Sequence, residues 1–177
     1  LRREITEEKP DRLGALGTAI EVEGKLKALK DKRSAVKFWQ GELAHAKDIS
    51  LRSRINKNIN ALSLEGLPAP EISMSDALGT APASLAALKG KPVLLFLWAN
   101  WCGDCKSQAS ILARIHQQYS QQGFVLLAPT RYYGSDDKKL TPTLEKAQVA
   151  KVWKESYAGL ESVPIVFDTE AMVRYGA

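Results

Sequence analysis

The spacing of hydrophobic positions changes part-way along the chain, and the change predicts two regions of different architecture. In the first region apolar residues recur every three or four positions, and no proline lies between Pro10 and Pro68, which favours helices. In the second, short runs of consecutive apolar residues alternate with helix-like segments, as in α/β domains with parallel strands. We expect an all-α segment over residues 1–63 and an α/β domain over residues 64–177, with the boundary near Gly66–Pro70.

The helical region contains one clear amphipathic run. Ala35, Val36, Trp39 and Leu43 share one face of a helix that is predicted to follow Ser34 as its N-cap. Further helices are expected over Ile20–Lys30 and from about Leu51 to Leu62.

The α/β region contains three strand-sized apolar runs, Val93–Ala99, Phe124–Ala128 and Val163–Phe167. The first run is apolar on both faces, which predicts a central strand covered on both sides. Helices are expected over Lys106–Gln121, Leu144–Tyr157 and Glu170–Tyr175. The candidate core contacts of the second of these helices are Leu144, Ala147, Val152 and Trp153.

The net charge of +5 belongs to the helical region. Residues 1–60 hold 14 Lys and Arg against 9 Asp and Glu, whereas the remaining residues hold 11 of each. No basic groove with interleaved aromatic residues is visible, so a nucleic-acid partner is not expected. The excess favours a solvated helix surface, and weak contact with an anionic membrane surface or an acidic partner is the alternative. No run of 18 apolar residues predicts a transmembrane helix.

The two cysteines, Cys102 and Cys105, lie between the first apolar run and a predicted helix. A cysteine at a helix N-terminus meets free backbone N–H groups, which can lower its pKa from about 8.5 toward 7. A C-x-x-C pair beside a βαβ pattern is typical of thiol–disulfide exchange. We expect Cys102 to attack a substrate disulfide and Cys105 to resolve the mixed disulfide, with Trp101 covering one side of the site.

Three other readings of the cysteines carry less weight. A structural zinc site needs four ligands, and the two histidines, His45 and His116, are far along the sequence from the pair. A purely structural disulfide would close too small a loop to stabilise the fold much. A peroxide-reducing cysteine would be expected to follow a Thr or Ser by three positions, where this chain has Ala99. No metal or organic cofactor is expected.

The residues around the cysteines resemble the TlpA-like branch of the thioredoxin superfamily. The resemblance is carried by Gly66-x-Pro-Ala-Pro, by Ser84-Leu-x-x-Leu-x-Gly-Lys-Pro, and by Trp98-Ala-x-Trp-Cys-Gly-x-Cys after the apolar run. It implies a thioredoxin-like three-layer α/β sandwich. It also implies an extracytoplasmic thiol–disulfide oxidoreductase of the bacterial periplasm that acts on disulfide-bearing proteins and takes electrons from a thiol donor. Because the chain opens on Leu1, we expect a processed or trimmed sequence from which a signal or anchor is absent.

The helical region resembles a single tetratricopeptide unit. An alanine, an aromatic residue four positions on and a leucine four further on occupy the packing face of the second helix of such a repeat, as Ala35, Trp39 and Leu43 do here. Ile20–Lys30 would be the first helix. One unit implies a helical hairpin that packs on the main domain or on a partner, and a generic amphipathic helix explains the pattern nearly as well.

The chain departs from the family pattern at two places. Asp104 stands between the cysteines where the family usually has proline, and its carboxylate opposes thiolate formation at Cys102. We therefore expect a more reducing couple than that of a strong disulfide donor, and a measured potential near about −120 mV would contradict this. The family's cis-proline is either Pro164 or lies beyond Ala177; we favour the second, which predicts a domain lacking its last two strands and an open edge of the sheet.

The predicted site therefore consists of catalytic Cys102 and Cys105, supported by Trp101, Gly103 and Asp104, with no metal. The segment Arg131–Gly134 follows a strand end near this site, and a solvated loop is favoured over a substrate groove. The alternative function is a protein-binding or assembly module on a redox-inactive or truncated thioredoxin-like scaffold.

Overall fold

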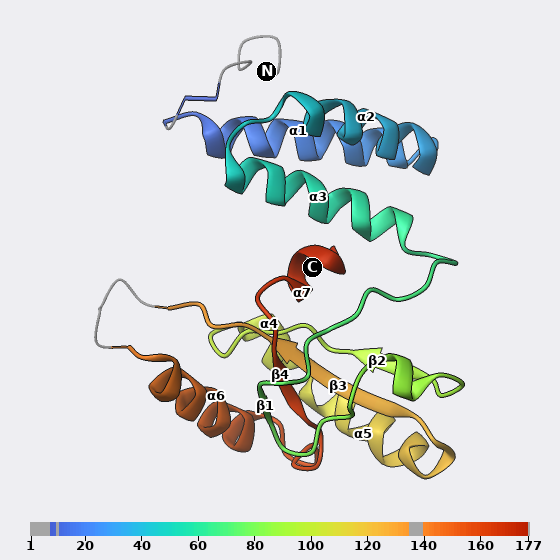
Figure 1. Ribbon diagram of the computed structural model, residues 1–177, viewed down its shortest axis with the longest axis vertical. Coiled ribbons are helices and arrows are strands. Elements are labelled where there is room, and N and C mark those ends of the chain that lie inside the picture. Colours follow the sequence, from blue (N-terminus) through green and yellow to red (C-terminus); the bar gives the residue numbers. More distant parts are fainter. Residues whose placement is uncertain (1–7, 10, 135–139, 177) are drawn as a thin grey trace. The chain divides into compact units, whose positions relative to one another are not determined.

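The computed structural model describes residues 8–9, 11–134 and 140–176 (Figure 1). The chain forms two compact units, one of residues 1–70 with 172–177 and one of residues 71–171. No helix in the described part of the chain is long and apolar enough to cross a bilayer.

The first unit contains three helices, α1 (Leu13–Ala28), α2 (Lys32–His45) and α3 (Ile49–Ser63), which pack against one another (Figure 1). Their shared core is formed by Leu16, Ile20, Ala35, Trp39, Ala46, Leu51, Ile55 and Ile59. The predicted apolar face of α2 is therefore correct, but its predicted N-cap is wrong. Asp31 caps the helix by accepting the backbone N–H groups of Arg33 and Ser34, because its extended backbone aims the carboxylate back at the first turn.

The C-terminal residues of the chain belong to this helical unit. Asn60 donates from Nδ2 to the carbonyl of Val173 over 2.8 Å, and the Tyr175 hydroxyl donates to the carbonyl of Pro70. Val173 lies within α7 (Ala171–Arg174), and Tyr175 follows it. The predicted limits at residues 63 and 64 stay a prediction.

The second unit is built on a four-stranded mixed sheet in the order β1-β4-β3-β2 (Figure 1). Its strands are β1 (Ala77–Leu78), β2 (Val93–Leu95), β3 (Val125–Thr130) and β4 (Ile165–Phe167). β2, β3 and β4 run parallel, and β1 pairs antiparallel with β4. The register places Val93 opposite Val125 and Ala128 opposite Ile165.

The expectation that Val93–Ala99 forms a central, fully covered strand is wrong. β2 lies at the edge of the described sheet, and Val93 is 37% exposed. Regular pairing stops at Leu95, although Phe96 and Trp98 still donate backbone N–H groups to Leu127 and Pro129. Pro129 has no N–H with which to return a bond to β2, which explains the early end of the strand.

Two helical segments connect the parallel strands. α4 (Gly103–Ser107) and α5 (Ala109–Tyr119) lead from β2 toward β3 and end in a 3₁₀ turn, η2 (Ser120–Gln122), while α6 (Pro142–Ser156) joins β3 to β4. A further 3₁₀ turn, η1 (Ala86–Leu88), precedes β2. Because the strand order advances in one direction, right-handed crossovers place both connections on the same face of the sheet. Leu112 of α5 and Trp153 of α6 accordingly belong to one core.

The predicted face of α6 is partly wrong. Leu144 is 52% exposed and Ala147 is also exposed, whereas Glu145, Val149 and Trp153 are buried. The prediction assigned Leu144 to the core because it is apolar. The helix instead turns Glu145 inward, where its carboxylate binds backbone N–H groups of the loop after β3.

Trp98 and Tyr157 lie in an aromatic cluster beneath the sheet. The Trp98 ring contacts Trp153 at 4.9 Å and Tyr157 at 5.2 Å, and Trp153 stacks on Tyr157 at 4.3 Å. The Tyr157 hydroxyl is buried with no hydrogen-bond partner in the described structure, and burial raises the pKa of Tyr157 to about 12.

We expect Tyr157→Phe to stabilise the protein at neutral pH by about 1 kcal/mol, because it removes an unsatisfied buried hydroxyl. The folded-state pKa lies above the unfolded value, so the stability of the native chain is fully present below pH 10 and is lost as the pH rises through about 12. The advantage of the variant should therefore grow by about 1 kcal/mol between pH 8 and pH 11. Urea unfolding at both values, with exposed Tyr119→Phe as the control, measures this; an advantage that does not grow with pH would contradict the assignment.

Candidate active site

The carboxyl ends of β2 and β3 meet at one edge of the sheet, because the two strands are parallel. The chain leaves β2 through Trp98, whose backbone N–H bonds to Pro129, and reaches Cys102 by a turn in which the N–H of Cys102 donates to Ala99 over 3.0 Å. The segment that follows β3, residues 131–134, begins at this same edge. The fold thus brings the cysteines and the loop after β3 to one end of the unit.

Cys102 and Cys105 are joined by a disulfide with their Cα atoms 5.3 Å apart. Cys102 is the N-cap of α4, and its Sγ accepts the backbone N–H of Cys105 over 3.2 Å. The predicted long helix from Lys106 is broken at Gln108, so α4 has only five residues. Stabilisation of negative charge on Cys102 therefore rests on this local N–H donor, which acts within the first turn.

The two sulfurs differ in their surroundings, although both cysteines are half-buried. Cys105 packs against the hydrophobic core of the unit, while Cys102 stands at the start of the helix with the N–H aimed at it. A thiolate would be better stabilised at Cys102 than at Cys105, since hydrogen bonding to the charged form favours it.

The three predicted supporting residues, Trp101, Gly103 and Asp104, are all exposed. Trp101 is 68% exposed, and its ring meets that of Tyr133 edge-on at 5.3 Å. Asp104 is exposed in the first turn of α4. Gly103 is also exposed, and a Cβ placed there would meet no atom within 4 Å, so packing does not require glycine at this position. The supporting roles of these three residues stay predictions.

Sequence reasoning missed the residues that hold the loop after β3. Glu145 accepts the backbone N–H groups of Tyr133 at 2.6 Å and Gly134 at 3.1 Å. Its position four residues before buried Val149 was the available signal, because residues at that spacing share a helix face.

A second set of contacts holds the same loop through Tyr132. The Tyr132 ring stacks on Phe167 at 4.7 Å, and its hydroxyl donates to Asp76 over 2.7 Å. Lys146 donates to the same carboxylate at 2.5 Å, and this hydrogen bond lowers the pKa of Asp76. Burial, assisted by the bond to Asp76, raises the pKa of Tyr132 to about 12, so its hydroxyl remains a donor at neutral pH.

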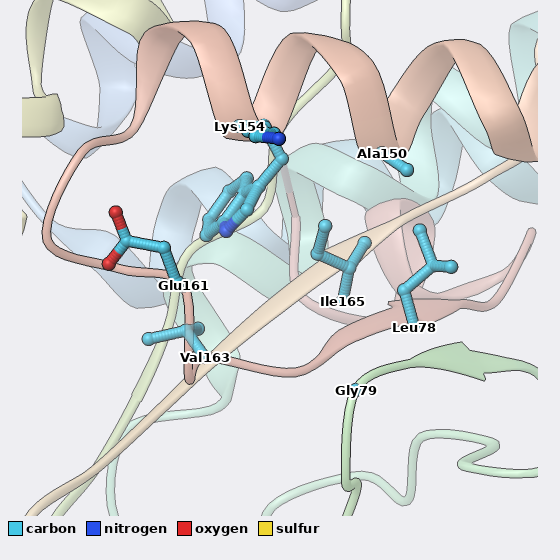
Figure 2. Close-up of a pocket in the computed structure, with 8 residues that line it drawn as sticks. Leu78, Gly79, Ala150, Lys154, Glu161, Val163 and Ile165 are labelled. Carbon is cyan, nitrogen blue, oxygen red and sulfur yellow. The ribbon is translucent and has the colours of Figure 1, made fainter.

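Two further hollows lie away from the disulfide. The hollow in Figure 2, about 280 Å³, lies between α6 and the β1–β4 pair and has an apolar floor that includes Leu78 and Ile165. The Glu161 carboxylate at its rim already accepts the N–H of Gly159, which lowers the pKa of Glu161.

The second hollow, about 320 Å³, contains His116 and Ser162 with Nε2 and Oγ 3.2 Å apart. Nδ1 of His116 is buried with no partner in the described structure, and an N–H there would have no acceptor. The tautomer of His116 decides whether Nε2 donates to the serine hydroxyl or accepts from it.

The structure also describes the peptide bond before Pro164 and the grouping of possible metal ligands. No peptide bond among the described residues is cis, so the bond before Pro164 is trans, and Pro164 is not a cis-proline in this structure. Within the described residues no group of three or more His, Cys, Asp or Glu side chains could hold a metal ion.

A mixed α/β sheet with a C-x-x-C disulfide at the carboxyl ends of its parallel strands defines a thioredoxin-like domain. The sequence profile of the AhpC/TSA family matches residues 66–174, and the chain belongs to this family. The predicted fold class, a thioredoxin-like α/β domain preceded by a helical segment, is confirmed. The comparisons do not resolve the TlpA-like branch or the tetratricopeptide resemblance.

Curated relatives match part of the chain. The chain is 28% identical to the thiol-disulfide oxidoreductase ResA of Oceanobacillus iheyensis over 41% of its own length and 39% of that protein. It is 34% identical to the thioredoxin-like protein YneN of Bacillus subtilis over 33% of its length and 34% of that protein. It is also 34% identical to putative glutathione peroxidase 7, chloroplastic, of Arabidopsis thaliana over 36% of its length and 28% of that protein. The chain thus spans between a quarter and two fifths of these relatives, and no solved structure gives a significant match.

Proposed function

We propose that the protein is a thiol–disulfide oxidoreductase that reduces disulfides in protein substrates through Cys102 and Cys105. The observation that carries the proposal is the disulfide at the carboxyl ends of the parallel strands, with a backbone N–H aimed at one of its sulfurs. The names of the relatives ResA and YneN agree with this chemistry.

The reaction follows from the two sulfur environments. The Cys102 thiolate attacks one sulfur of the substrate disulfide, forms a mixed disulfide and releases the first substrate thiolate. Cys105, deprotonated, then attacks Sγ of Cys102, which releases the second substrate thiol and forms the Cys102–Cys105 disulfide. Two electrons and two protons have passed to the substrate. A thiol donor returns the protein to its dithiol form by two exchanges of the same kind, and the exchange itself needs no metal or organic cofactor.

The proposal also covers the location of the protein in the cell and the roles of its two regions. We place the protein outside the cytoplasm, in the bacterial periplasm, because the resemblance around Trp98–Cys105 is to extracytoplasmic reductases. The domain of residues 64–177 would carry the reaction. Residues 1–63 would be a separate helical segment, tetratricopeptide-like in its packing face, whose basic surface contacts solvent, an acidic partner or anionic lipid.

Insulin reduction tests the proposal. With dithiothreitol as donor, the protein should accelerate precipitation of the insulin B chain at substoichiometric concentration. A rate equal to that with dithiothreitol alone would contradict the proposal and favour a binding module. Turnover of hydrogen peroxide without insulin reduction would contradict it as well, and would assign the cysteines to the chemistry named for the Arabidopsis relative.

A further inference from the structure

The loop after β3 places an aromatic ring, with a cation over it, against Trp101, the residue before Cys102. Its two tyrosines make different contacts. Tyr132 points to the core side, where it stacks on Phe167. Tyr133 meets the exposed ring of Trp101 at 5.3 Å. The guanidinium of Arg131 lies over the Tyr133 ring, 4.7 Å from its centroid.

Two sets of contacts hold the loop after β3 in this arrangement. Glu145 takes two successive backbone N–H groups of the loop, and Tyr132 is held by both its ring and its hydroxyl. A solvated loop, the favoured expectation from sequence, would not need a buried carboxylate to anchor it. The anchors fix the backbone positions from which Arg131 and Tyr133 extend, which is how a binding surface is preorganised.

The Arg131 guanidinium interacts with the Tyr133 side chain and has no carboxylate partner among the described residues. Its Nε is buried without an acceptor in the described structure. The side chain as a whole is half-buried, so it is oriented by Tyr133 yet still reachable. A guanidinium in this state favours a carboxylate ligand, because it offers several donors in a fixed plane.

We infer that Arg131, whose guanidinium lies over the Tyr133 ring, binds a carboxylate of the substrate next to its disulfide and so selects protein substrates whose cysteines are flanked by acidic residues. The inference rests on the function proposed above. The Trp101 and Tyr133 rings supply an apolar platform for the substrate backbone, and the cation supplies the preference for charge. Tyr133 is a positioning residue, and Arg131 determines specificity.

Two disulfide peptides of identical sequence, differing only in Glu or Lys at the positions that flank one cysteine, test the inference. The native protein should reduce the Glu peptide with a kcat/KM about tenfold above that for the Lys peptide, mainly through KM, and the preference should fall with added salt. Arg131→Gln should abolish the preference. Lys91→Gln, which removes an exposed cation elsewhere on the same unit, should retain it.

Each outcome separates the inference from the function on which it rests. Reduction of neither peptide by the native protein would overturn the proposed function, whereas equal reduction of both would overturn the inference alone. Arg131→Lys keeps the charge and should keep part of the preference, which excludes a folding defect as the cause in Arg131→Gln. If Arg131→Gln changes the pH profile of Cys102 alkylation and leaves the preference intact, Arg131 acts on the thiolate and the inference is wrong.

Discussion

Replacing Cys102 by serine is expected to slow disulfide reduction by at least about a thousandfold, because a hydroxyl is not ionised near neutral pH and cannot attack a disulfide. The loss should appear in kcat/KM for insulin with dithiothreitol as donor. The fold should be unaffected, since Cys102 is half-buried and its sulfur contacts a backbone N–H that a serine oxygen can also accept.

Cys105→Ser is the matched control for this prediction. It removes the same disulfide and also stops the intramolecular resolving step, but it leaves the attacking sulfur in place. The first exchange should therefore remain measurable in a single turnover with Cys105→Ser and be absent with Cys102→Ser. Equal single-turnover rates in the two variants would contradict the assignment of Cys102 as the nucleophile.

Gly24→Ala is expected to destabilise the helical unit by about 3 kcal/mol, because overpacking a well-filled site forces neighbouring side chains to move. A Cβ at Gly24 would lie 2.0 Å from the ring of Trp39. That ring is 2% exposed and is held by a bond from Nε1 to the carbonyl of Ile20, so it has little freedom to shift. The measurement is urea unfolding of the full chain followed by far-ultraviolet circular dichroism.

Gly41→Ala supplies the control for the helical unit. Gly41 is also inside a helix, and a Cβ there would meet no atom within 4 Å. Alanine should stabilise the chain by up to about 1 kcal/mol through helix propensity alone. If both substitutions stabilise the protein, the close packing of α1 on Trp39 is wrong.

The order of helices and strands and the position of the disulfide could be predicted because they depend on local pattern. Three apolar runs, the helices between them and the C-x-x-C spacing were enough to place Cys102 at the carboxyl end of a strand. The predicted helix from Leu51 to Leu62 is likewise confirmed as α3. Each of these features is contained in a window of fewer than twenty residues, where periodicity is informative.

The features that escaped prediction depend on contacts distant in sequence. β1 is two residues long and exists only through pairing with β4, so it has no pattern of its own. Ser34 and Asp31 are both good caps by type, and only the backbone conformation selects Asp31.

The loop beside the disulfide is another such feature. Nothing in Arg131–Gly134 indicates that Glu145, from the next helix, anchors it. The spacing to Val149 places Glu145 on the buried face of α6, but it does not show which groups the buried carboxylate binds.

The measurement that tests the account most directly is the identity of the cysteine joined to substrate in a trapped mixed disulfide. Cys105→Ser is mixed with a disulfide peptide, quenched with acid, digested without reductant and analysed by mass spectrometry. The account predicts a covalent adduct of the peptide at Cys102, and an adduct at Cys105 when Cys102→Ser is tested should be absent or far slower to form. An adduct that forms readily at Cys105, or none with either variant, would contradict the claim that the sulfur capped by the Cys105 N–H is the attacking group.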